Sequence, residues 1–113
     1  MREIEEYLVS DPEFGQELIG LLIGNLIEFR DSLSMTVKEG KSIFFFKAHH
    51  KLRTTLDLIG NKKLELQADQ IHATFKDEGI SAVDKRTQNA FCRLCKSSIE
   101  TLESKLKNYQ TAL

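Results

Sequence analysis

Two adjacent histidines, His49 and His50, are the residues of this sequence best placed to do chemistry near neutral pH. An imidazole with its unperturbed pKa of about 6.5 is mainly neutral there and offers a ring nitrogen as a nucleophile. Successive side chains on an α-helix diverge by about 100°, so the two rings must face different surroundings. With Phe45 at the centre of the apolar face, His49 falls on the flank of that face and His50 points outward. We therefore expect His50 to be the reactive residue and His49 to be a packed or hydrogen-bonded structural one.

Positively charged side chains surround His50. Lys47, Lys51 and Arg53 lie within one helical turn of it, and cations in such positions stabilise the charge on a transferred group without a metal ion. A transfer reaction also needs a group that orients the histidine ring. The alternative interpretation is that His50 is one surface histidine among ordinary lysines.

The spacing of the residues after His50 favours the reactive interpretation. The segment reads His50, Lys51, Leu52, Arg53 and Thr54, followed by Gly60 and Leu64. It resembles the phospho-acceptor motif of histidine-containing phosphotransfer (HPt) domains, the four-helix modules of bacterial and plant phosphorelays. That motif has histidine, any residue, leucine, lysine and glycine, then a second glycine after five further residues and an apolar residue four later. The resemblance covers nearly the whole chain, and its register selects His50 rather than His49.

Two positions depart from the family motif. Arg53 replaces lysine and keeps the positive charge, but it spreads that charge over a larger planar group. Thr54 replaces the glycine that leaves room beside the histidine for the incoming partner. A β-branched side chain there narrows the approach.

The resemblance implies a phosphorelay protein of two-component signal transduction. His50 would accept a phosphoryl group from the aspartate of one receiver domain, through its outer ring nitrogen, and pass it to another. The receiver domains of response regulators or hybrid histidine kinases would be the partners and would supply the magnesium ion. This chain would hold no cofactor and no metal, and it would not be an enzyme, because it has no phosphate-activating site of its own. Lys47, Lys51 and Arg53 would complement the phosphoryl charge.

Further roles are implied for His72 and for a docking surface. His72 lies twenty-two residues beyond His50, where many HPt domains have a glutamine that holds the phospho-accepting ring. The alternative is a partly buried histidine satisfied by a carbonyl group. Phe46, Ile43 and Thr54 would contribute to receiver docking, although Phe46 could instead pack between the first two long helices or under the N-terminal segment.

Two other functions remain open. In the first, Thr54 blocks transfer, and a degenerate HPt-like bundle binds a receiver or kinase as a non-catalytic scaffold or inhibitor. In the second, the Cys92-Arg93-Leu94-Cys95 segment forms a metal or redox site. A zinc site needs four ligands and no second cysteine pair exists, while a thioredoxin-like motif would follow a strand rather than lie in mid-helix. Buried core cysteines are therefore the better interpretation.

The composition is that of an ordinary globular protein. Residues 1–113 are enough for one domain with its own core, and apolar and charged residues make up 41% and 29% of the chain. Sixteen basic and seventeen acidic residues leave a net charge of −1, which argues against a nucleic-acid partner. The longest apolar run is interrupted by Gly20, Gly24 and Asn25 and falls short of the roughly 20 residues of a membrane span. With no export signal and two cysteines, we expect a cytoplasmic protein and no membrane partner.

Amphipathic helices must position these residues. The pattern predicts a short N-terminal helical segment over 3–9 and long helices over 12–37, 41–58 and 62–76, with a last helix that a Ser81–Asp84 capping pair starts and that ends near Tyr109. Gly20 and Gly24 predict the close approach of a neighbouring helix. One proline and no strand-like alternation argue for an all-α fold, an antiparallel up-down four-helix bundle.

Overall fold

Helices account for nearly all of the backbone in the computed structural model, which describes residues 2–112 and side chains as far as residue 109. The elements are α1 (Arg2–Ser10), α2 (Pro12–Glu39), α3 (Ile43–Lys51), α4 (Arg53–Ile59), α5 (Lys62–Asp77), the 3₁₀ turn η1 (Ile80–Ala82) and α6 (Lys85–Ala112). Residues 2–112 contain no strand, and the predicted all-α class is confirmed.

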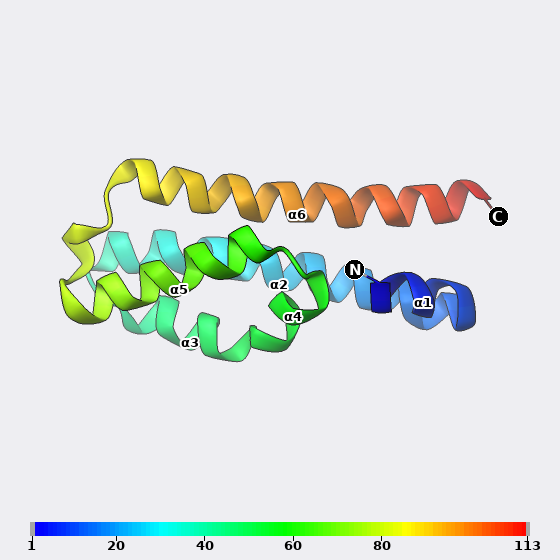
Figure 1. Ribbon diagram of the computed structural model, residues 1–113, viewed down its shortest axis with the longest axis horizontal. Helices are drawn as coiled ribbons and strands as arrows, with labels where there is room; N and C mark the ends of the chain where they lie inside the picture. Colours follow the sequence, from blue (N-terminus) through cyan, green and yellow to red (C-terminus); the bar gives the residue numbers. More distant parts are fainter. Residues whose placement is uncertain (1, 113) are drawn as a thin grey trace.

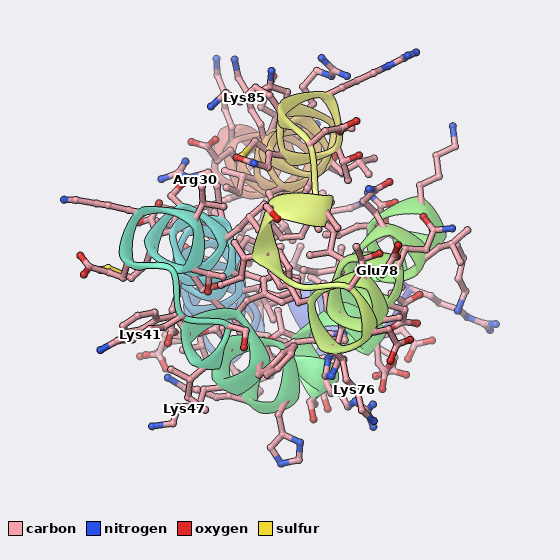
Figure 2. All side chains as sticks on the ribbon, turned by 90° about the vertical axis from the view of Figure 1, so that its left-hand side faces the viewer. Arg30, Lys41, Lys47, Lys76, Glu78 and Lys85 are labelled. Carbon is pink, nitrogen blue, oxygen red and sulfur yellow. The ribbon has the colours of Figure 1, made fainter. Side chains whose placement is uncertain are left out.

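The long helices lie side by side along a body of 49 × 22 × 22 Å. In Figure 1, α2 and α5 run in one direction along the long axis, while α3, α4 and α6 run back. The helix α2 contacts α1, α3 and α6, and α5 contacts α3 and α6. Seen end-on in Figure 2, these helices surround a common core.

Capping residues mark the starts of α2 and α5 and the ends of α2 and α4, within two residues of the predicted positions. The Asp11 carboxylate accepts a hydrogen bond from a first-turn backbone N–H of α2, and the side chain of Asn61 does the same for α5. Gly40 and Gly60 follow α2 and α4 with φ angles of 67° and 68°. This left-handed conformation suits glycine, because a β-carbon there costs energy.

The predicted helix over 41–58 is wrong in one respect, because it is divided at Leu52. Leu52 has φ −97° and ψ 14°, which separates α3 from α4. Its own N–H still bonds the carbonyl of Ala48 at 2.9 Å, and its carbonyl accepts from the N–H of Leu56 at 3.0 Å. The chain therefore bends here without losing these bonds, just before two β-branched threonines that lower helix propensity.

The prediction for Gly20 and Gly24 is also wrong. A β-carbon built at either position would meet no atom within 4 Å, so no helix approaches closely there. The close approach is at Gly15, where a β-carbon would lie 2.9 Å from the backbone of Leu8 in α1. Glycine thus lets α1 fold back against the start of α2.

The last helix begins differently from the prediction. Ser81 lies within η1 and does not pair with Asp84 across a capping box. The Asp84 carboxylate alone accepts from the N–H of Thr87 at 2.8 Å, and α6 starts at Lys85.

Three phenylalanines form the centre of the core beside α3. Phe29 of α2, Phe45 of α3 and Phe91 of α6 are fully buried. The ring centroids of Phe29 and Phe45 are 5.3 Å apart, and Phe91 meets both edge to face. Burying these large apolar side chains is a main source of stability, and here it joins three helices.

Candidate functional site

The two adjacent histidines of α3 face opposite environments, as predicted. His49 is buried, with 5% of its surface accessible, whereas His50 is exposed. Among residues 2–112, no hydrogen bond, ion pair or ring contact involves the His50 side chain. A neutral imidazole in this setting is open to a partner from solvent.

Interactions on the opposite side of α3 hold the helix in place. Ser42 precedes α3 but makes no capping bond with its side chain. Instead the fully buried Thr36 of α2 accepts a hydrogen bond at 3.0 Å from the N–H of Phe45. Phe45 and Ala48 bury their side chains in the core. The position of the His50 backbone therefore depends on α2 as well as on α3.

The predicted cations differ in how freely they can act. Lys47 is exposed and points away from the core on the α3 side (Figure 2). Lys51 is paired with Glu28 of α2, with Nζ to carboxylate distances of 3.0 and 3.3 Å. Arg53 is exposed at the start of α4, beyond the bend at Leu52.

His72 contacts His49 rather than His50. Its Nδ1 lies 2.8 Å from Nδ1 of His49, and its ring stacks on Phe46 with centroids 4.5 Å apart. No hydrogen bond joins His72 to His50 in the part of the chain that the structure describes. The structure therefore does not bring together the predicted acceptor and its predicted orienting residue.

His49 is enclosed more fully than the sequence indicates. Its ring packs against both Phe29 and Phe45, with centroid distances of 5.9 and 5.7 Å, and its Nε2 lies 3.2 Å from the carboxylate of Asp69. Burial lowers the pKa of His49, helped by the nearby His72 and Arg53, while Asp69 opposes the shift. Asp69 was not foreseen, although its place three residues before His72 puts both on one face of α5.

The predicted docking residues lie on two helices and differ in exposure. Ile43 is exposed, with 47% of its surface accessible, and it lies two turns before His50 on the same stripe as Lys47. Phe46 is half-buried against His72, so it packs on α5 rather than between the first two long helices. Thr54 is exposed in α4.

A groove of about 650 Å³ runs between α2 and α3, beside the stripe formed by Ile43, Lys47 and His50. Its apolar part comes from Ile27, Met35, Phe44 and Ala48, and Gly24 leaves space in its wall. Charged side chains border it: Glu28, Asp31, Lys47 and Lys51. The sequence does not indicate this groove, since the open side of Gly24 depends on where α3 lies.

The cysteines do not form a reactive pair. Cys95 is fully buried and Cys92 half-buried in the middle of α6, and both are free thiols. Burial raises the pKa of Cys95 to about 12, so its reactive thiolate is scarce near neutral pH. No group of three or more potential metal ligands of the His, Cys, Asp or Glu type occurs within the described residues.

No family model, no curated protein and no solved structure matches this chain. Among residues 2–112, no helix is long and apolar enough to span a bilayer.

Proposed function

We propose that this chain is a histidine phosphotransfer protein that carries a phosphoryl group between receiver-domain aspartates on His50. The nucleophile would be the neutral ring through its outer nitrogen. The phosphorus–oxygen bond of the aspartyl phosphate breaks as the phosphorus–nitrogen bond forms, and the carboxylate leaves. The proton on the other ring nitrogen can then pass to solvent.

The exposure of His50 beside a buried His49 is the observation that carries the proposal. The motif requires an accessible histidine on a helix whose apolar positions lie in a core. Leu52 and Leu64 are buried, and Gly60 ends α4 in the left-handed conformation. These four positions therefore have surroundings that suit their roles in an HPt motif.

The surface around His50 supports binding of a receiver. Ile43 supplies an apolar contact on the same stripe, and Lys47 supplies a cation that no other described side chain engages. Arg53 adds positive charge from α4. Lys51 contributes less, because its pair with Glu28 already offsets its charge.

The finer architecture belongs to the same proposal. We infer that α2, the bent α3–α4 pair, α5 and α6 form the antiparallel four-helix bundle used by HPt domains. The contacts of α2 and of α5 with both α3 and α6 support this arrangement, as do the alternating directions in Figure 1. α1 would be an addition at one end.

Exposed Thr54 favours one alternative function. Its side chain stands at the position where the HPt motif has glycine, and it occupies space that an incoming receiver would need. If this obstruction is complete, the same surface binds a receiver as a scaffold or inhibitor without transfer.

The test is phosphoryl transfer from a panel of phosphorylated receiver domains with magnesium and a radiolabelled donor. The parent should take up label that is acid-labile and stable to alkali, and His50→Gln should take up none. Asn89→Ala, an exposed change on α6, serves as the matched control and should label like the parent. Binding of a receiver without any label on the parent would reject transfer and favour the scaffold.

A further inference from the structure

We propose that Asp69, His49 and His72 form a hydrogen-bonded chain that fixes α3 against α5 and thereby positions His50 for transfer. These three are positioning residues, since none of them would contact the phosphoryl group. The inference rests on the proposed function of His50 and adds to it a device that the HPt resemblance does not supply. We call these residues the Asp69–His49–His72 chain.

The contacts assign a proton to each ring. The Asp69 carboxylate can only accept, so Nε2 of His49, 3.2 Å away, must donate. A neutral His49 then has a lone pair on Nδ1. The Nδ1 of His72, 2.8 Å away, must therefore carry the hydrogen that joins the rings. This leaves Nε2 of His72 as the open end.

The Asp69–His49–His72 chain keeps its hydrogen bonds when one proton is added, but not when two are added. A proton on Nε2 of His72 leaves every hydrogen bond in place. A proton on Nδ1 of His49 would set two N–H groups against each other at 2.8 Å. Burial of His49 against two phenylalanine rings opposes that second protonation.

Charged groups on both neighbouring helices face this region. From α4 come Arg53 and Asp57, and from α5 come Glu65, Asp69, Lys76 and Asp77, which line the two adjoining pockets beside His49. The α2 and α6 side chains in this part of the core are the apolar Phe29 and Phe91. Arg53 is the nearby cation that disfavours a charged His49.

The geometry explains how the Asp69–His49–His72 chain would act on His50. The side chain of His50 has no partner of its own among the described residues, so its placement depends on its backbone. His49 is the preceding residue, and its ring packs against Phe29 and Phe45 and has a partner at each nitrogen, His72 at Nδ1 and Asp69 at Nε2. Fixing one ring therefore limits the movement of the adjacent acceptor.

The test compares His72→Phe with His72→Gln. Phenylalanine keeps a ring against Phe46 and removes the donor to His49, while glutamine keeps a side-chain N–H that can donate. In His72→Phe we expect amide hydrogen exchange in α3 to be about tenfold faster, the size expected for one lost hydrogen bond. Transfer to His50 at saturating receiver should fall by a similar factor, about tenfold, with half-saturation unchanged. His72→Gln should restore both quantities to near the parent values.

Nitrogen-15 NMR tests the proton assignment directly. Neutral His49 should carry its hydrogen on Nε2 and neutral His72 on Nδ1, and the reverse assignment would overturn the proposal. Amide hydrogen exchange in α3 that is unchanged in His72→Phe would show that the Asp69–His49–His72 chain does not fix α3. If the parent is labelled normally, unchanged phosphoryl transfer to His50 in His72→Phe would overturn the positioning role alone. If no receiver labels the parent, the proposed function is overturned, and with it the role of the Asp69–His49–His72 chain in transfer.

Discussion

Acidification should destabilise this fold through His49. Its pKa is lowered in the folded protein, mainly by burial, and returns to about 6.5 on unfolding. Between the folded and unfolded pKa values the unfolded chain binds more protons, so the free energy of unfolding decreases as the pH falls below about 6.5. One proton corresponds to a slope of at most about 1.4 kcal/mol per pH unit. We therefore expect a loss of at most about 1 kcal/mol between about pH 6.5 and 5.5.

Urea unfolding followed by circular dichroism at a series of pH values measures this slope. His49→Phe keeps an aromatic ring against Phe29 and Phe45 but cannot titrate, so its free energy of unfolding should fall less than that of the parent between about pH 6.5 and 5.5. His50→Gln, a change at an exposed site, should keep the parent slope. The lowered carboxyl pKa of Asp84 affects stability only at lower pH. Equal slopes for the parent and His49→Phe would refute the assignment of the acid sensitivity to His49.

Substitutions at four further positions test the packing and the approach to His50. Thr36→Val removes the acceptor of the buried Phe45 N–H and should cost about 1–3 kcal/mol in urea unfolding; Thr36→Ser keeps the hydroxyl, and an equal loss in both would contradict the role of that bond. Gly15→Ala places a methyl against the Leu8 backbone and should cost about 1–3 kcal/mol. Gly20→Ala meets open space and should instead stabilise by about 0.5–1 kcal/mol, so a similar thermal midpoint for the two variants would show that Gly15 is not tightly packed. Thr54→Gly should lower stability by only about 0.3 kcal/mol yet raise the rate of transfer to His50, and a lower rate would show that Thr54 does not obstruct the receiver.

Local signals predicted the bounds of α2 and α5 to within two residues. Asp11, Gly40, Gly60 and Asn61 act through their own backbone or through neighbours within a turn, so their effect can be inferred without knowing the tertiary structure. The spacing of the apolar residues likewise predicted a buried His49 and an exposed His50, because that distinction depends only on the direction of each side chain around one helix.

Contacts between helices were harder to infer. Gly20 and Gly15 have the same chemistry, and only the path of α1 decides which of them meets a backbone. The residue pairing with His72 depended on the rotation of α5 relative to α3, which a spacing of twenty-two residues does not specify. That rotation brings His72 to His49 and places Asp69 on the other nitrogen of the same ring.

The bend at Leu52 divides the motif between two helical segments with different anchors. His50 belongs to α3, which Thr36 ties to α2, whereas Thr54 belongs to α4. In α4 the neighbouring Thr55 accepts a hydrogen bond at 2.9 Å from Asn25 of α2. Substitutions at Asn25 would therefore alter the space in front of His50 while leaving the Thr36 hydrogen bond to α3 intact. Under the proposed transfer function, partner access to His50 and the placement of His50 could be changed by separate mutations, even though His50 and Thr54 are only four positions apart.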